Sequence, residues 1–330
     1  MPENEEIMSN LDSQNMSQRD ITAMGKMIRG MRAAYANGEN AMEYARNFIN
    51  RSENLTISTL IAYDLQAGNY VDHARSHTEE RAKWCKQLAK ILSPFLTEQS
   101  SVLEVGCGEA TTLSGVLNFL ENKPKMVKGL DISWSRCAHG RNWLEENHVS
   151  AELFVADLFQ IPMEDSSVDV VYTSHSLEPN GGNEEAALKE LLRVSRRAVI
   201  LVEPLYELAD STAQARMREH GYVRGLKETA ERLGAKVTDY RLLDYSGNPL
   251  NPSGLIKLEK QHVESPDEEV FKWRCPLTHS KLISSEHGYY SPDVGVVYPV
   301  LAGIPLLMQK HAIIASSFES IAVGNSITKS

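Results

Sequence analysis

The feature that most constrains the fold is an alternation between short apolar runs and stretches of helical periodicity, which starts near residue 101 and continues to about residue 260. The runs predict strands at 102–105, 127–130, 151–155, 168–173 and 198–202, and the helical patterns lie near 110–121, 134–147, 184–195 and 213–233. Such alternation is typical of a parallel sheet, because each helix carries the chain back across the sheet. Two further runs, 236–243 and 254–259, predict a closing hairpin.

The N-terminal region has a helical pattern instead. Five apolar residues recur there at helical spacing, and we expect them to pack into a core: Ile21, Met24, Met27, Ile28 and Met31. Turn-forming residues at 37–40 break that helix, and a second predicted helix at 78–92 ends at Ser93 and Pro94.

The end of the chain has a third character. An acidic, proline-containing stretch at 263–269 predicts a linker, and short apolar runs and turns follow it. We therefore expect a helical cap at 1–77, an α/β domain at 78–262 and a small β-rich module with a tail at 263–330.

Composition excludes several classes of protein. The longest apolar run, 295–308, is shorter than a membrane span and holds two prolines, and the acidic N-terminus is unlike a secretory signal, so we expect a cytoplasmic protein without a membrane partner. Four scattered cysteines argue against both a disulfide framework and a four-cysteine metal site. The net charge of −10 and the absence of a basic run disfavour a nucleic-acid partner.

A glycine-rich turn follows the first predicted strand. Gly106 and Gly108 lie between that strand and a helix, where a backbone can approach a nucleoside closely. A dinucleotide-binding loop would have a third glycine where this chain has Thr111. Glu104 and Glu109 flank the turn, and two carboxylates oppose a pyrophosphate but suit a ligand with an ammonium and a sulfonium group. This pattern favours S-adenosylmethionine.

Acidic residues also follow the next two strands. Asp131 closes the second strand and can accept both hydroxyls of a ribose, and Asp157 follows the third, where it can accept a hydrogen bond from an adenine amine. We include their neighbours Ile132 and Leu158 among the predicted cofactor-binding residues. Each acid taken alone is equally compatible with a local helix cap.

Together these segments resemble the class I S-adenosylmethionine-dependent methyltransferases. The resemblance rests on residues 104–110, Asp131, Asp157 and 168–172, and covers about 78–260. It implies a Rossmann-like, seven-stranded sheet, a methionine-binding role for Glu104, Gly106 and Gly108, a ribose-binding role for Asp131 and an adenine-binding role for Asp157. Ala110 is a departure, because the family often has a third glycine there.

Further candidates lie around this predicted cofactor site. Tyr70 lies where such enzymes often place a lid, and its ring could face the sulfonium or simply pack against a helix. His175 follows the fourth strand and is the best-placed general base for a hydroxyl acceptor, with Glu203 and His220 as second candidates. The motif of methyltransferases that act on planar nitrogens is missing, and no cluster at metal-ligand spacing is present.

The last segment resembles the small activator subunit of tRNA and protein methyltransferases and its zinc-ribbon-like relatives. Tyr298, Pro299 and the run 303–305 match that family, but Thr278 and Ser291 stand at or near positions where it has cysteines. With only Cys275 remaining, we expect no metal.

The sequence thus predicts a methyltransferase that uses S-adenosylmethionine to methylate an oxygen, or as a second choice a nitrogen, of a small metabolite such as a sugar derivative or secondary metabolite. Two alternatives remain open, namely a methyltransferase acting on tRNA or protein and a non-catalytic nucleoside-binding scaffold. A homodimer through the cap or the C-terminal module is also compatible with the sequence.

Overall fold

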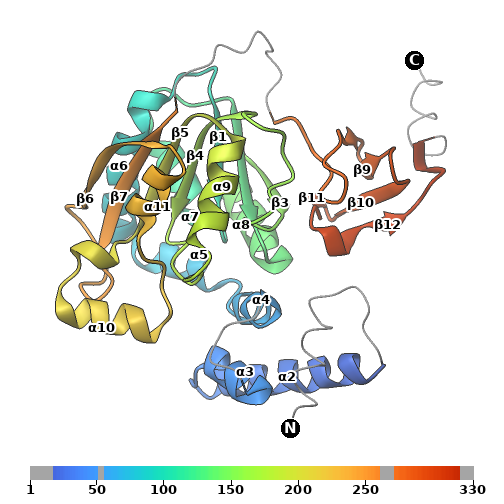
Figure 1. Cartoon of the computed structure of the whole chain (residues 1–330), viewed down its shortest axis with the longest axis horizontal. Helices are drawn as coiled ribbons and strands as arrows, with labels where there is room; N and C mark the ends of the chain where they lie inside the picture. The colour runs from blue at the N-terminus through green and yellow to red at the C-terminus, as the bar shows by residue number, and fades with distance from the viewer. Residues whose placement is uncertain (1–17, 51–55, 261–270, 320–330) are drawn as a thin grey trace. The chain divides into compact units, whose positions relative to one another are not determined.

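The computed structural model describes residues 18–50, 56–260 and 271–319, and its packing divides the chain into two compact units, 1–69 and 70–330 (Figure 1). We describe each unit by itself. The predicted linker at 263–269 lies outside the described residues.

The first unit is helical. It contains α2 (Gln18–Ala36), α3 (Ala41–Ile49) and α4 (Thr56–Leu65), and Met27 and Met31 are fully buried in its core. Ile21, from the same predicted stripe, is 49% exposed. Asn40 is the last residue of the predicted break at 37–40. It caps α3, because its side-chain oxygen accepts hydrogen bonds from the amides of Met42 and Glu43.

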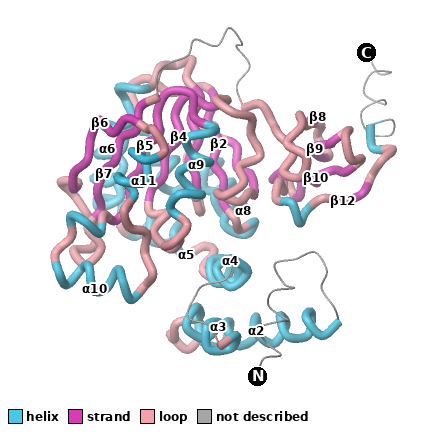
Figure 2. The backbone as a smooth tube through the Cα atoms, in the orientation of Figure 1, coloured by secondary structure: helices cyan, strands magenta, loops and turns pink. Residues whose placement is uncertain are grey.

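The second unit is built on a seven-stranded sheet in the order β3-β2-β1-β4-β5-β7-β6. Figure 2 draws its strands in magenta. Its strands are β1 (Ser101–Val105), β2 (Met126–Asp131), β3 (Glu152–Val155), β4 (Val168–Ser174), β5 (Ser195–Pro204), β6 (Lys236–Leu242) and β7 (Ser253–Glu259). The first five are parallel, and β6 and β7 form an antiparallel hairpin beside β5. The predicted Rossmann-like architecture is confirmed.

Helices cover both faces of this sheet. Leu103, Val171 and Val199 contribute to one core with α9 (Glu184–Val194) and α11 (Leu226–Arg232). The neighbouring residues Val102 and Val170 contribute to the other core, with α6 (Thr78–Leu92), α7 (Thr111–Phe119) and α8 (Trp134–Glu146). Successive strand residues point to opposite faces, so strands buried on both faces are apolar throughout.

Two details differ from the sequence prediction. The single helix expected at 213–233 is wrong, because α10 (Ser211–Glu219) and α11 are separate helices. Gly221 and Gly225 adopt φ values of +67° and +62° between them, which a continuing helix does not allow. In addition, α5 (Asn69–Ser76) packs with the second unit, since Val71 contacts Trp143 of α8. The limits at 77 and 262 remain predictions.

The C-terminal part forms a separate small β-sheet. Its strands are β8 (Ile283–Ser284), β9 (Gly288–Ser291), β10 (Val296–Leu301), β11 (Ile304–Pro305) and β12 (Ile313–Ile314). This sheet lies against the edge of β3, where the Leu307 amide donates to the Val155 carbonyl at 2.8 Å. Leu307 and Tyr298 belong to the same core as the residues beneath α9. The module therefore covers the outer edge strand of the large sheet.

Cys275 lies fully buried inside this module. Burial raises the pKa of its thiol, but hydrogen bonds with Ser291, Thr278 and Tyr298 outweigh burial and lower the pKa overall. The positions at which the resemblance placed missing cysteines thus meet around the remaining one as a hydrogen-bonded cluster.

Candidate functional site

The glycine turn is held by a close contact with the loop after β4. The amides of Gly106 and Cys107 both donate to the Leu130 carbonyl at 2.8 Å. Gly106 has φ +74°, and a β-carbon there would lie 2.2 Å from the β-carbon of Ser176. Only glycine fits such an approach without movement of one segment. Ala110 also adopts a left-handed conformation, with φ +53°, so the departure from glycine retains the backbone shape that glycine favours.

Asp131 joins this turn to the end of β2. One carboxylate oxygen accepts a hydrogen bond from the Gly108 amide at 2.9 Å, and the other accepts one from the Ser133 amide at 2.9 Å. Burial raises the pKa of Asp131, and the nearby Arg136 guanidinium and the backbone donors oppose that rise. Ile132 is half-buried beside it. The predicted ribose ligand is therefore already part of the loop's hydrogen-bond network.

Asp157 lies at the end of β3, as predicted. One of its side-chain oxygens accepts a hydrogen bond from the Phe159 amide at 2.9 Å, and the neighbouring Leu158 is half-buried. Asp131 and Asp157 thus both accept a backbone hydrogen bond from two residues further on, as in an Asx turn, and neither is the helix cap that the sequence left open, since Ser133 caps α8 and no helix directly follows Asp157. Because a carboxylate oxygen has two lone pairs, this does not prevent ligand binding.

The two glutamates of the loop have different surroundings from those predicted. Glu104 is buried in β1 and accepts a hydrogen bond from the Tyr172 hydroxyl at 2.9 Å. Burial raises the pKa of Glu104 to about 8, so near neutral pH it is largely protonated unless a cation lies close to it. Glu109 accepts a hydrogen bond from the Val71 amide at 2.8 Å and so ties α5 to the loop.

Tyr70, the predicted lid residue, has a cation against its ring. The Arg136 guanidinium of α8 lies 4.6 Å from the ring centroid, so one face of the ring contacts arginine. Sequence reasoning missed Arg136. It was visible as a basic residue in the first turn of α8, where the helix dipole disfavours a positive charge.

His175 is held at both ring nitrogens. Nδ1 lies 3.0 Å from a carboxylate oxygen of Glu178, Nε2 lies 2.6 Å from the Ser253 hydroxyl, and the Trp84 ring packs edge-on against the imidazole. Burial lowers the pKa of His175, but the Glu178 carboxylate, with help from Glu203, raises it overall. Sequence analysis named neither Glu178 nor Ser253, although the spacing of His175 and Glu178 was a visible signal.

Glu203 and His220 are placed very differently. Glu203 is fully buried at the end of β5, and its carboxylate accepts hydrogen bonds from the amides of Ser176 and Glu178 at 3.1 and 3.2 Å. Burial raises the pKa of Glu203 to about 7, against the opposing effect of His175. His220 is exposed at the end of α10, and its Nδ1 bonds to the Arg216 carbonyl of the same helix. Its ring packs edge-on against Tyr222, with the ring centroids 5.6 Å apart, and it makes no direct contact with His175 among the described residues.

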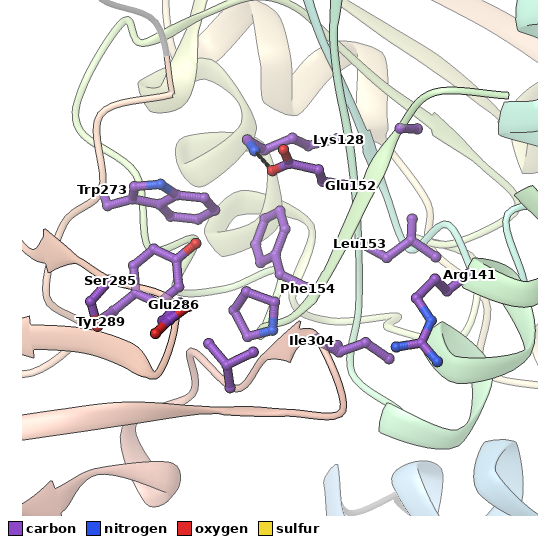
Figure 3. A pocket seen from close by; sticks show the side chains of 14 residues that line it. Lys128, Arg141, Glu152, Leu153, Phe154, Trp273, Ser285, Glu286, Tyr289 and Ile304 are labelled. Carbon is purple, nitrogen blue, oxygen red and sulfur yellow. Dashed lines mark hydrogen bonds and ion pairs between the residues drawn. The ribbon is translucent and has the colours of Figure 1, made fainter. Parts of the chain in front are cut away.

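A cavity of 340 Å³ lies elsewhere, between β3 and the C-terminal module (Figure 3). Phe154, Trp273 and Tyr289 line it, and Lys128 forms an ion pair with Glu152 at its side. These two residues lie in the starting halves of β2 and β3, away from the strand ends that bear Asp131 and Asp157. The cavity is therefore distinct from the cluster around the glycine turn.

The part of the chain that the structure describes contains no group of three or more His, Cys, Asp or Glu side chains placed to hold a metal ion. Within those same residues, no helix combines the length and the apolar character needed to span a membrane.

Comparison with known proteins identifies the domain. Residues 102–198 match the family model described as a methyltransferase domain, whereas no curated protein matches the chain. Among solved structures, the magnesium protoporphyrin IX methyltransferase of Synechocystis PCC 6803 is 13% identical, with a TM-score of 0.46, over 62% of this chain and 100% of that one.

Two further solved structures are similar. A putative methyltransferase in complex with the Haloferax volcanii Trm112 methyltransferase activator is 15% identical, with a TM-score of 0.48, over 61% of this chain and 98% of that one. An S-adenosylmethionine-dependent methyltransferase of Aquifex aeolicus is 16% identical, with a TM-score of 0.40, over 52% of this chain and 87% of that one. The strand order, the glycine turn and the family match agree: residues 102–198 belong to a methyltransferase domain, and its methyl donor is S-adenosylmethionine.

Proposed function

We propose that the protein transfers a methyl group from S-adenosylmethionine to an oxygen of a small metabolite, with His175 as the general base. The observation that carries this proposal is the position of the His175–Glu178 pair. His175 directly precedes Ser176, whose side chain packs on Gly106 and whose hydroxyl donates to the Val105 carbonyl at 2.7 Å. The base is therefore one residue away from the donor-binding turn.

The residues around the turn fit the donor. Gly106 and Gly108 both have positive φ values, which glycine adopts readily, so the turn keeps the shape expected of a loop whose backbone approaches a nucleoside. Asp131 and Asp157 follow neighbouring strands and are assigned the ribose and the adenine. When bound, the donor supplies a methyl group on a positively charged sulfur, and the buried carboxyl of Glu104 would favour that positive charge in its ionised form.

His175 can remove the proton of an acceptor hydroxyl. Glu178 accepts a hydrogen bond from Nδ1–H, which leaves Nε2 as the basic nitrogen and stabilises the imidazolium that forms. The Ser253 hydroxyl, 2.6 Å from Nε2, lies where an acceptor hydroxyl would approach. Methyl transfer then needs proximity and alignment more than further chemical assistance. A nitrogen acceptor is the second choice, because an amine that is already neutral attacks without the general base that His175 would provide.

The other predictions complete this proposal. The C-terminal module resembles methyltransferase activators. We assign it the role of covering β3, and we expect it not to bind a metal. We propose a cytoplasmic protein with a small-molecule acceptor and no nucleic-acid or membrane partner, and a homodimer remains compatible with it. The favoured rivals are still a tRNA or protein methyltransferase and a nucleoside-binding scaffold.

One experiment separates these functions. The full chain is incubated with labelled S-adenosylmethionine and either a metabolite extract or the macromolecules of the same cells, and the products are analysed by mass spectrometry. A metabolite that gains one methyl group supports the proposal, and labelled RNA or protein alone would contradict it. Donor binding by calorimetry without any methylated product in either extract would favour the scaffold.

A further inference from the structure

Three arginines on one side of the candidate site are stacked on tyrosines. The Arg216 guanidinium lies 5.8 Å from the Tyr222 ring centroid, and those of Arg218 and Arg224 each lie 5.8 Å from the ring centroid of Tyr206. Within residues 18–50, 56–260 and 271–319, none of the three arginines forms an ion pair with a carboxylate. Guanidinium groups without a carboxylate partner are unexpected in a chain with a net charge of −10, because its acidic side chains outnumber its basic ones.

Tyr222 belongs to the same site as His175. The Val223 amide donates to the Glu178 carbonyl at 3.0 Å, and the Gly181 amide donates to the Gly221 carbonyl at 3.1 Å. A β-carbon on Gly181 would lie 2.3 Å from that same carbonyl oxygen, so the two loops are in close contact. The turn between α10 and α11 is therefore packed directly on the loop that carries the proposed base.

The Tyr222 hydroxyl connects the two halves of the site. Burial raises the pKa of Tyr222, the Glu178 carboxylate and the Tyr70 phenol raise it further, and a hydrogen bond with Arg216 opposes the rise. Each of these groups therefore lies close enough to influence the phenol. Glu178 bonds to His175 on the acceptor side, and Tyr70 stacks on Arg136 on the donor side. Arg216 stacks on Tyr222, and Tyr222 is influenced by Glu178 on the acceptor side and by Tyr70 on the donor side.

Arg216 also has unused hydrogen-bonding capacity. Its Nη1 is buried from solvent and has no hydrogen-bond partner among the described residues, although the side chain as a whole is half-buried. A buried N–H group without an acceptor is destabilising, and the planar guanidinium matches the two oxygens of a carboxylate or a phosphate. Because the side chain as a whole is only half-buried and has no carboxylate partner among the described residues, a negatively charged group of a ligand would pair with the guanidinium through charge-assisted hydrogen bonds.

We propose that the methyl acceptor is an anionic small molecule, and that Arg216 and Tyr222 form the subsite for its carboxylate or phosphate monoester. This inference rests on the proposed function, because it assigns the anion to the molecule whose hydroxyl faces His175. The subsite holds the acceptor at one end while His175 contacts the other.

The first test identifies the charge of the acceptor. A metabolite extract is divided by anion exchange into bound and unbound fractions, and each is incubated with the full chain and labelled S-adenosylmethionine. We expect methylated product from the bound fraction. Loss of that product after phosphatase treatment of the fraction would identify a phosphate monoester, and its persistence a carboxylate. Product from the unbound fraction alone overturns the anion subsite but leaves the methyltransferase proposal intact, whereas product from neither fraction counts against both.

The second test assigns the anion to Arg216. With the purified acceptor, Arg216→Gln should raise KM at least about tenfold, as expected for loss of a charge-assisted bond, and Arg216→Lys should recover part of it. Arg232→Gln removes an equal charge from the exposed surface and should leave KM unchanged. Calorimetric binding of the donor should be the same in all variants, which shows that they fold. An unchanged KM in Arg216→Gln would overturn the proposal.

Discussion

Replacing Gly106 by alanine tests whether the glycine turn depends on its contact with Ser176. The new β-carbon would lie 2.2 Å from the Ser176 β-carbon, where ordinary contacts are 3.4 Å or more, so one segment must move by more than 1 Å. Overpacking of this kind costs about 1 to 3 kcal/mol, and the left-handed conformation at φ +74° costs alanine about 1 to 2 kcal/mol more. We expect unfolding to be easier by about 2 to 5 kcal/mol.

Gly234 provides the matched control. It has φ +84° with no atom within 4 Å of an added β-carbon, so Gly234→Ala carries the conformational cost alone. Differential scanning calorimetry should show a larger fall in Tm for Gly106→Ala, by roughly 2 to 4 °C for each kcal/mol of steric cost. Calorimetric titration should show weaker donor binding in the same variant.

A second substitution distinguishes steric overlap from other causes. Ser176→Gly removes the β-carbon that the alanine would meet, so in the double variant the steric cost should largely disappear and the two substitutions should not be additive. Equal Tm values for Gly106→Ala and Gly234→Ala, or strict additivity with Ser176→Gly, would refute the reasoning.

Three further predictions follow from the site. First, burial raises the pKa of Glu203 to about 7 from an unfolded value of 4.5, so the folded protein binds this proton more tightly than the unfolded chain. The stability of the fold should therefore fall as pH rises from about 4.5 through about 7. Glu203→Gln should make Tm less dependent on pH over that range, whereas Glu79→Gln on the exposed surface should not. Second, Asp131→Asn should weaken donor binding at least about tenfold by calorimetry, since it removes the charge that accepts the ribose hydroxyls; unchanged binding would contradict the ribose assignment. Third, His175→Gln should lower kcat by roughly 10²- to 10⁴-fold with donor affinity retained, whereas His220→Gln, which removes only a ring that packs on Tyr222, should lower kcat far less, and the reverse result would exchange their roles.

Features encoded by neighbouring residues were predictable. The five parallel strands, the closing hairpin and the positions of Gly106, Asp131 and Asp157 at strand ends follow from apolar periodicity and turn residues, which act locally. The break between α10 and α11 was missed because the helical periodicity on either side of Gly221 and Gly225 concealed it. A glycine within a helical pattern is ambiguous until tertiary contacts decide the conformation.

The roles of individual side chains could not be predicted from local patterns in the sequence. Glu104 was expected as a negative charge, but burial beside Tyr172 raises its pKa to about 8, and a pKa depends on neighbours distant in the sequence. Tyr70 was left between facing the sulfonium and packing on a helix, and only the structure showed that Arg136 of α8 stacks on it.

The sequence by itself thus determined the α/β architecture and the class of methyl donor, because these depend on short-range periodicity and on a few residues at strand ends; the donor-binding edge of the sheet stays a prediction. Only the tertiary structure brought Ser253 from β7 to His175 after β4, and the Tyr222 turn to Glu178. These partners are separated by tens of residues in the chain. Packing alone selects which distant side chains meet, and therefore decides how the charges of the site are balanced.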